Sequence, residues 1–175
     1  ALAQAGTPYS GILYAGLMLT EAGPKLVEYN VRFGDPECQA LMMRLESDLL
    51  ELAITTARGE LALAAPPVFA DEAALTIAVA AEGYPGTPRT GGEIEGIDRA
   101  EASGAKVFQA GTREKGRKLV ASGGRVLGVT ATGATVLEAQ EAAYRAVDAI
   151  DFPTGFCRRD IGWREVERIA AAAEG

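Results

Sequence analysis

The sequence predicts an α+β protein, in which an antiparallel hairpin and two helices precede a small β-rich, barrel-like unit with helices of its own. Three observations support this class. Two apolar runs around a Gly-Pro turn open the chain, and segments with apolar residues at helical spacing follow them. Past a stretch of small residues, short apolar segments alternate with glycine-rich turns, a pattern typical of a curled sheet.

The hairpin is predicted over residues 12–19 and 25–31, because a short turn containing Gly23 and Pro24 separates the two apolar runs. Successive side chains of a strand point to opposite faces, so the second run should place alternate residues on one surface. These alternate residues are Glu28, Asn30 and Arg32. The sequence therefore predicts a polar face near the end of the hairpin.

Two helices should follow the hairpin. Asp35 can cap the first, and Pro36 suits the first helical position, so this helix is expected to run to about Leu45. Ser47 offers a second cap, for a helix over residues 48–58 whose apolar residues recur on one face.

Small residues and prolines at residues 62–67 mark the best candidate boundary. We therefore expect one domain over residues 1–62 and a β-rich domain over residues 63–175. Short strands separated by glycines are predicted in the second domain at residues 74–81, 106–110, 118–120 and 125–130.

The second domain should also carry two helices. Thr135 and Glu138 fit a capping box, and apolar residues recur at helical spacing from there to Ile150. A final helix is expected from about Trp163 to Ala173.

The composition excludes several kinds of site. The formal net charge is −7 and no stripe of Lys and Arg occurs, so nucleic acid is not an expected partner. The chain has no histidine, which excludes imidazole-dependent triads and His-ligated zinc within it. Any metal bound here would need oxygen ligands.

The two cysteines favour a reducing compartment, which we expect to be the cytoplasm. Cys38 and Cys157 lie far apart and form no CxxC pair, a pattern typical of apolar thiols. The longest apolar stretches are too short to cross a bilayer, so a membrane is not an expected partner. Because the chain opens at Ala1 without a methionine, we expect it to begin inside a larger protein.

The polar face of the second strand suits a hard cation beside phosphate. Glu28 offers a carboxylate and Asn30 an amide oxygen, both of which Mg²⁺ accepts while it keeps water and phosphate ligands. Arg32 would project toward the same space, and the helix after Asp35 adds backbone amide donors. The alternative is a solvated face of an edge strand, with Asp35 and Glu37 only beginning a helix.

The polar face belongs to a longer pattern. Residues 11–18 (GILYAGLM) and 28–39 (EYNVRFGDPECQ) resemble the phosphoribosylamine-glycine ligase family, whose pattern is close to LYAGLM followed by E-[FY]-N-x-R-F-G-D-P-E-x-Q. Further blocks resemble the same family in the same order: SDLL at 47–50, EGYPG at 82–86, VFQAGT at 107–112, GGRVLGV at 123–129 and RRDIG at 158–162. Several blocks in register are much harder to obtain by chance than any one motif.

The resemblance implies the C-terminal part of an ATP-grasp enzyme. Such an enzyme uses ATP to activate glycine as an acyl phosphate and joins it to phosphoribosylamine, giving glycinamide ribonucleotide. The resemblance implies that Glu28 and Asn30 hold Mg²⁺ (or Mn²⁺) beneath the ATP phosphates, and that Arg32 helps to neutralise the transferred phosphoryl group. Asp35 joins Arg32 among the expected catalytic residues, and Glu37 is expected to bind substrate.

Arg125 is a further candidate for substrate binding. It follows Gly123 and Gly124, whose small size lets a ligand approach the backbone. Similar glycine-arginine segments in related purine ATP-grasp enzymes favour a contact with the 5-phosphate of phosphoribosylamine. The alternative is a surface arginine that begins a strand.

The chain departs from the family pattern in three ways. Residues 14–16 carry no acid where many ATP-grasp enzymes have a further metal ligand, and Gln109 stands where the family commonly has a histidine. Family members also have an N-terminal substrate domain and an ATP lid before the hairpin, so we expect this chain alone to be inactive. Two alternatives remain open: another ATP-grasp carboxylate-amine ligase or carboxylase, and a binding module without catalysis.

Overall fold

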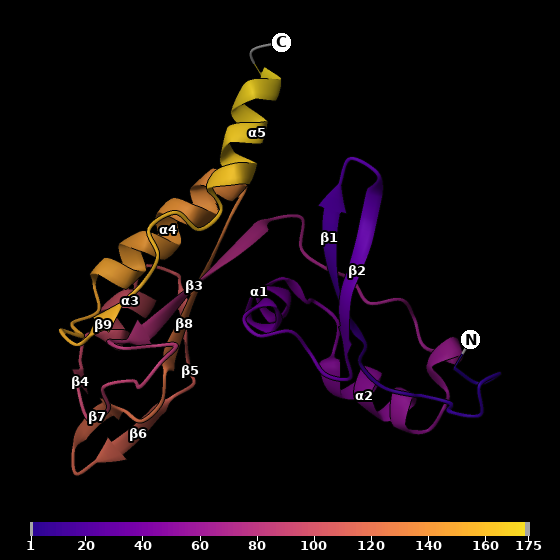
Figure 1. The fold of residues 1–175 in the computed structure, drawn as a ribbon, viewed down its shortest axis with the longest axis horizontal. Coiled ribbons are helices and arrows are strands. Elements are labelled where there is room, and N and C mark those ends of the chain that lie inside the picture. The colour runs from indigo at the N-terminus through magenta and orange to yellow at the C-terminus, as the bar shows by residue number, and fades with distance from the viewer. Residues whose placement is uncertain (1, 174–175) are drawn as a thin grey trace. The chain divides into compact units, whose positions relative to one another are not determined.

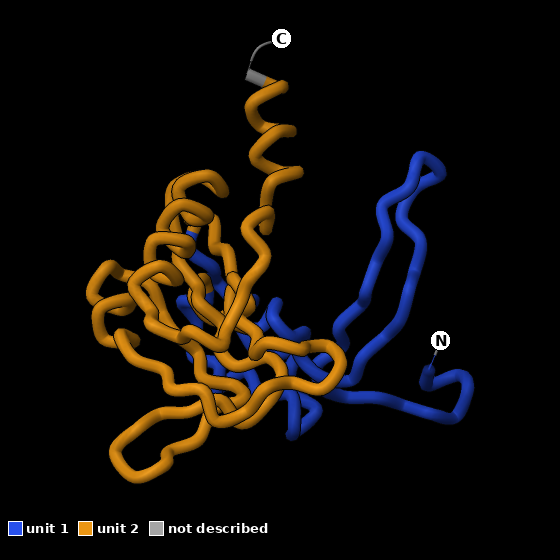
Figure 2. The backbone as a smooth tube through the Cα atoms, turned by 60° about the vertical axis from the view of Figure 1, so that its left-hand side comes forward, with its two compact units in different colours: residues 1–38, 45–70 blue, residues 39–44, 71–175 orange. Residues whose placement is uncertain are grey.

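The computed structural model describes residues 2–173, which divide into two compact units. Figure 2 distinguishes the first unit, residues 1–38 and 45–70, from the second unit, residues 39–44 and 71–175. The short segment 39–44 belongs to the second unit, in which the Gln39 side chain lies over Gly128, where an added Cβ would meet it at 3.6 Å.

The first unit opens with the predicted hairpin, formed by β1 (Tyr14–Thr20) and β2 (Gly23–Asn30) (Figure 1). The strands pair antiparallel, from Tyr14 opposite Asn30 to Thr20 opposite Gly23. Gly23 has a φ of 93°, a left-handed conformation that glycine adopts without steric cost. The prediction of the hairpin from its turn residues is therefore confirmed.

Helices α1 (Glu37–Arg44) and α2 (Leu49–Ala57) and the 3-10 turn η1 (Leu61–Leu63) follow the hairpin. The cap of α2 is Asp48, whose carboxylate accepts a hydrogen bond from the Leu50 amide at 2.7 Å. The prediction of Ser47 as this cap was wrong, because its hydroxyl accepts a hydrogen bond from the Val68 amide instead.

The segment that follows the predicted linker pairs with the chain before α2. The amide of Glu46 donates to the Val68 carbonyl at 3.0 Å, and the Val68 amide donates to the Ser47 hydroxyl at 2.8 Å. These bonds keep residues up to 70 in the first unit. The division of the chain thus falls later than the boundary expected after residue 62.

The second unit contains two antiparallel sheets (Figure 1). One has the strand order β5 (Lys106–Gln109), β8 (Arg125–Gly133), β3 (Ala73–Ala81) and β9 (Gly155–Phe156). The other has the order β4 (Glu93–Ile94), β7 (Lys118–Ala121) and β6 (Thr112–Lys115). Besides residues 39–44 of α1, this part contains the helices α3 (Ile97–Glu101), α4 (Val136–Asp148) and α5 (Trp163–Ala173). The predicted β-rich character is confirmed, with the strands shared between two sheets.

The core of the second unit lies where α4 packs against β3 and β8. Ile77 and Val129 expose 0% of their surface on the central strands, and Ala139 and Ala143 expose 0% on the helix. The small alanines let the helix approach the sheet closely, which gives the dense packing that cores require. Full burial of a side chain such as Ile77 contributes about 1.5–3 kcal/mol to stability.

Helix α4 begins with the predicted Thr135 cap, and Glu138 reaches back to the amide one residue before it. The Thr135 hydroxyl accepts a hydrogen bond from the Glu138 amide at 3.2 Å, and the Glu138 carboxylate accepts one from the Ala134 amide at 2.9 Å. Side-chain oxygens thus satisfy two backbone donors where the helix starts. No helix among residues 2–173 has both the length and the apolar character needed to cross a bilayer.

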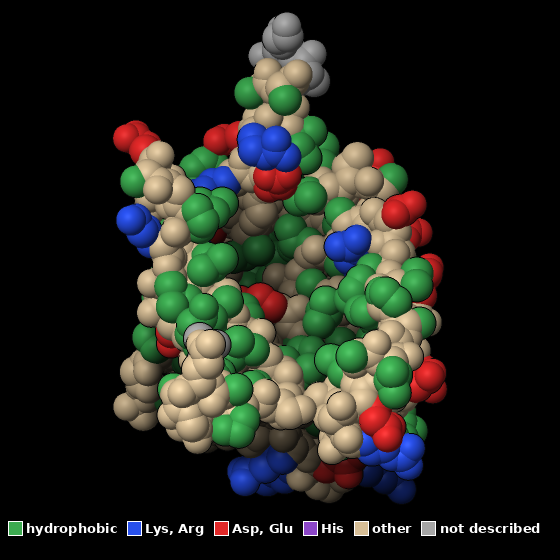
Figure 3. All heavy atoms as spheres, turned by 90° about the vertical axis from the view of Figure 1, so that its right-hand side faces the viewer, with side chains coloured by type: hydrophobic (Ala, Val, Ile, Leu, Met, Phe, Trp, Pro, Cys, Tyr) green, Lys and Arg blue, Asp and Glu red, His purple; other side chains and the backbone are tan. Residues whose placement is uncertain are grey.

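Apolar side chains of the hairpin are exposed. Leu17, Met18 and Val27 expose more than half of their surface, and Leu19 exposes 82%. Figure 3 shows hydrophobic side chains, in green, spread over the face that it views. Within residues 2–173, the buried hydrophobic side chains all belong to the second unit. Apolar burial therefore stabilises the second unit far more than the first.

Candidate functional site

The polar face predicted on the second strand is present at the end of β2. Asn30 Nδ2 donates a hydrogen bond to Glu28 Oε1, with 2.9 Å between the two atoms. Arg32, just after the strand, donates from Nη2 to Asn30 Oδ1 at 3.4 Å and from Nη1 to the Phe33 carbonyl at 2.7 Å. A carboxylate, an amide and a guanidinium group therefore lie side by side.

A β-bulge lies directly before Glu28 in β2. Leu17 pairs with Leu26 whereas Gly16 pairs with Glu28, so Val27 is an extra residue in β2. Bulges of this kind re-aim side chains and are frequent beside functional sites. Gly16 leaves the opposite position open, since a Cβ there would lie 3.4 Å from Cγ of Glu28. Strand β1 therefore leaves open space beside Glu28 and places no acidic side chain there.

Glu37 is joined to the hairpin by a hydrogen bond. It is the first residue of α1, and its Oε1 accepts a hydrogen bond from the Tyr14 hydroxyl at 3.1 Å. This carboxylate is the main cause of a raised pKa of Tyr14, because a negatively charged acceptor stabilises the protonated phenol. Gly34 permits the tight turn before the helix, since a side chain there would collide with Glu37.

The first unit contains five of the six predicted site residues. Glu28, Arg32, Asp35 and Glu37 are exposed, and Asn30 is half-buried. Asp35 lies in the turn between β2 and α1. Glu28 and Arg32 thus place a carboxylate and a guanidinium group on either side of the Asn30 amide.

Arg125 lies in the second unit, as the exposed first residue of β8. Its carbonyl accepts a hydrogen bond from the Gly111 amide at 3.0 Å. The glycines before it make room for other parts of the protein. A Cβ at Gly124 would collide with the Tyr84 ring, and one at Gly111 would lie 2.9 Å from Cα of Gly123. Glycine is therefore needed at these positions for packing within the protein, which was not predicted from the sequence.

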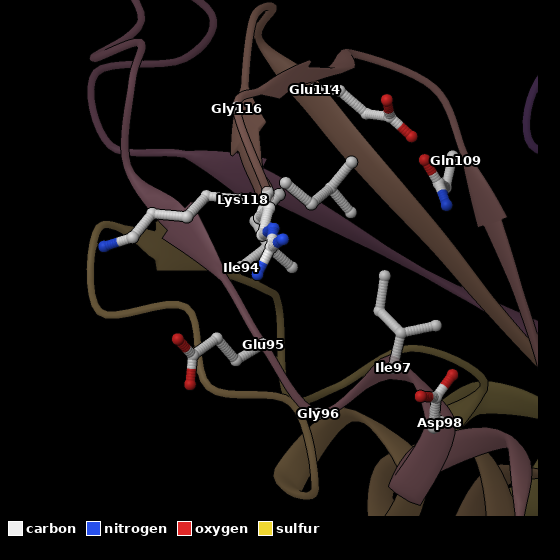
Figure 4. A pocket seen from close by; sticks show the side chains of 11 residues that line it. Ile94, Glu95, Gly96, Ile97, Asp98, Gln109, Glu114, Gly116 and Lys118 are labelled. Carbon is white, nitrogen blue, oxygen red and sulfur yellow. The ribbon is translucent and has the colours of Figure 1, made fainter.

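A hollow of about 430 Å³ also opens on the second unit (Figure 4). Gln109 and Glu114 lie on one side of it, and Lys118 lies on another. Lys118 is already paired with Glu93 at 2.7 Å, so its charge is partly satisfied. Arg125 is not among the residues that line the hollow, and the mixed charges there select no single class of ligand.

Sequence reasoning missed Tyr14 as a member of the site. The residue stands in the LYAGLM block, and antiparallel pairing places it directly opposite Asn30. The register of the hairpin could have indicated this neighbour. The hydrogen bond to Glu37 could not have been predicted, because the turn between β2 and α1 determines it.

Comparison with known protein families agrees with the resemblance of the motifs. The pattern described as "Phosphoribosylglycinamide synthetase, C domain" matches residues 74–164. The pattern described as "Phosphoribosylglycinamide synthetase, ATP-grasp (A) domain" matches residues 1–38. The two patterns thus match separate parts of the chain.

Individual relatives agree with this assignment. The chain is 58% identical over 171 residues to the phosphoribosylamine–glycine ligase of Mesorhizobium japonicum, which covers 98% of this chain and 40% of that protein. It is 46% identical over 178 residues to the chloroplastic phosphoribosylamine–glycine ligase of Arabidopsis thaliana, covering 99% of this chain and 33% of the relative. The chain therefore spans about two fifths or less of the length of these relatives.

A solved structure has the same fold. The crystal structure of the phosphoribosylamine–glycine ligase from Thermotoga maritima matches with a TM-score of 0.76 and 36% sequence identity. The match covers 91% of this chain and 39% of that one. Since the C-domain pattern alone matches residues 74–164 of 175, the chain belongs to the phosphoribosylglycinamide synthetase family, whose members are also named phosphoribosylamine–glycine ligases.

Proposed function

We propose that the complete protein ligates glycine to 5-phosphoribosylamine in purine biosynthesis, giving glycinamide ribonucleotide, ADP and phosphate. The carboxylate of glycine takes the γ-phosphoryl group of ATP, and the amine of phosphoribosylamine then displaces phosphate from the glycyl phosphate. The proposal depends on two hydrogen bonds, which join Asn30 to Glu28 on one side and to Arg32 on the other, in a chain that belongs to this family. These groups suit a metal-bound triphosphate.

Glu28 and Asn30 suit one divalent cation, either Mg²⁺ or Mn²⁺. Their nearest polar atoms lie 2.9 Å apart, so both side chains can reach the same ion. A half-turn of the Asn30 amide would exchange Nδ2 for Oδ1 on the side that faces the carboxylate. Among residues 2–173, no group of three or more His, Cys, Asp or Glu could hold a metal, so a cation held by Glu28 and Asn30 would need phosphate and water as its remaining ligands. When bound, such a cation offsets the negative charge of the phosphates.

The other candidate residues take roles that follow from their charge. Arg32 would stabilise the charge on the transferred phosphoryl group, and Asp35 would be a second catalytic residue. Glu37 would bind an amino group of the substrate, and the exposed Arg125 would bind the 5-phosphate of phosphoribosylamine. Further domains of the same protein would complete the sites for ATP and glycine.

A cytoplasmic location is part of the proposal. Cys38 and Cys157 are half-buried free thiols, and burial is the main cause of the raised pKa of each. A raised pKa lowers the thiolate fraction, and thiolate is the reactive form. Unreactive thiols without a disulfide are typical of a reducing compartment.

The full-length protein can be tested directly for ADP release. We expect release to require glycine and phosphoribosylamine together. Release without glycine, or a preference for another carboxylic acid, would indicate a different ATP-grasp ligase or carboxylase. Failure to bind ATP and Mg²⁺ in calorimetry would indicate a binding module without catalysis.

The metal assignment predicts a specific defect. In the full-length protein, Glu28→Gln or Asn30→Ala should lower turnover by about 100-fold and raise the Mg²⁺ concentration needed for half-maximal rate, because an oxygen ligand is lost or weakened. Steady-state kinetics over a Mg²⁺ series measures both effects. The control is Glu21→Gln in the hairpin turn, which should leave them unchanged. Wild-type kinetics at limiting Mg²⁺ in both site variants would refute the assignment.

A further inference from the structure

We propose that Tyr14 is a positioning residue of the ligase, whose hydroxyl group holds the Glu37 carboxylate in place to bind the ammonium group of glycine. The inference rests on the proposed function and adds to it a residue and a substrate group. It follows from the hairpin register, from one hydrogen bond and from the charge of the two amines in the reaction.

Tyr14 shares a strand face with the proposed metal ligands. It lies directly opposite Asn30, and Gly16 lies directly opposite Glu28. Residues that face each other across an antiparallel pair project to the same side of the sheet. The Tyr14 ring therefore stands on the polar face, and Gly16 leaves space between it and Glu28.

The Tyr14 hydroxyl reaches beyond the hairpin to the start of α1. Tyr14 Oη and Glu37 Oε1 are 3.1 Å apart, and the two residues are separated by 23 positions in the sequence. Both groups belong to the first unit. One rigid side chain thus connects the strand that carries the metal ligands to a carboxylate that follows them in the chain.

This bond restricts a side chain that would otherwise be mobile. Glu37 is exposed, and an exposed glutamate loses considerable rotamer entropy when it binds a ligand. Tyrosine has few torsions, so a hydrogen bond from its ring hydroxyl orders the carboxylate before substrate arrives. The bond takes one lone pair of Oε1, and a carboxylate has further lone pairs with which Glu37 can accept a hydrogen bond from substrate.

The two substrates each carry an amino group, and their charges indicate which of the two the Glu37 carboxylate would bind. Free glycine carries a protonated ammonium group at neutral pH, and a carboxylate pairs well with it. The amine of phosphoribosylamine must be neutral to act as a nucleophile, so pairing with a carboxylate would not favour its attack. The Glu37 carboxylate therefore suits glycine, and the role of Tyr14 is to fix its position.

The test compares Tyr14→Phe with Tyr9→Phe in the full-length protein. Both variants remove one tyrosine hydroxyl from the first unit, and that of Tyr9 donates to the carbonyl of Ile12, three residues away, at 2.7 Å. For Tyr14→Phe we expect the KM for glycine to rise about tenfold, with kcat within about twofold and the KM for ATP unchanged. Tyr9→Phe should match the wild type in all three constants.

A second variant separates positioning from charge. Glu37→Asp keeps the carboxylate but is one methylene shorter, so it should lose the Tyr14 bond and show a similar rise in glycine KM. Adding Tyr14→Phe to Glu37→Asp should then cause no further rise, because the two changes remove the same interaction.

Three outcomes would overturn the inference. The first is a glycine KM in Tyr14→Phe equal to that of Tyr9→Phe. The second is an equal loss for glycine and ATP together with a lower unfolding temperature, which would show that Tyr14 only supports the fold. The third, a wild-type protein whose ADP release does not depend on glycine, would overturn the proposed function as well, so the two failures are distinguishable.

Discussion

Asn30 connects the charged groups of the candidate site at the scale of single residues. Its amide nitrogen donates a hydrogen bond to Glu28, and its amide oxygen accepts one from Arg32. One side chain thus holds the carboxylate and the guanidinium group on either side of it. An aspartate at this position would place two carboxylates within hydrogen-bonding distance and would lose the donor between them. An amide therefore suits this position better than an acid while no metal is bound.

Arg125 provides a prediction at the same scale. In the full-length protein, Arg125→Ala should raise the KM for phosphoribosylamine by about tenfold or more and leave the KM for ATP nearly unchanged, because a planar guanidinium pairs with phosphate through two hydrogen bonds. Initial-rate kinetics with each substrate varied in turn measures the difference. Arg113→Ala, at an exposed position of β6, is the control. Equal loss for both substrates would indicate a folding defect and argue against the phosphate contact.

Helix starts are determined by short-range chemistry at the scale of secondary-structure elements. Asp48 caps α2 and Thr135 caps α4, each by accepting hydrogen bonds from amides two or three residues ahead. Such caps satisfy donors that have no partner within the helix, so they depend on a few consecutive residues. Helix α4 also lies against the core strands, so its cap supports the packed part of the molecule.

The cap of α4 predicts a measurable loss of stability. Thr135→Ala should lower the free energy of unfolding by about 1 kcal/mol, because the Glu138 amide loses its acceptor. Denaturant unfolding followed by circular dichroism gives this value. Thr90→Ala, at an exposed loop position, should change it by less than about 0.5 kcal/mol. A loss no larger than this control would show that the cap contributes little.

The whole molecule has an uneven distribution of buried apolar surface. The central strands β3 and β8 and helix α4 contribute most of the buried side chains, whereas the hairpin exposes its leucines. Side chains already in contact with water gain little from folding, because the hydrophobic effect scales with the area removed from water. The stability of this chain should therefore depend mainly on the second unit.

Two truncations to alanine test this contrast. Ile77→Ala should lower the free energy of unfolding by about 2–5 kcal/mol, since it leaves a cavity at a position with 0% exposure. Leu19→Ala, where 82% of the side chain is exposed, should change it by less than about 0.5 kcal/mol. Thermal or denaturant unfolding of both variants provides the comparison. Similar losses at the two sites would show that the hairpin is buried in solution.

Some strands could not be predicted from the sequence. Strand β6 has the sequence TREK, which has no apolar alternation, and it is a strand because its backbone pairs with β7. Strands β4 and β9 are two residues long and were missed for the same reason. Pairing with a neighbour supplies the hydrogen bonds that define such segments, and the neighbour is not encoded locally.

The sequence by itself determined the hairpin, the cap of α4 and the shared face of Glu28 and Asn30, because these depend on turn residues and on strand alternation over a few positions. Only the tertiary structure decided that the Tyr14 hydroxyl meets Glu37 and that Gln39 lies over Gly128. Contacts of this second kind join residues distant in the chain, and their formation depends on how turns and packed elements direct the backbone between them.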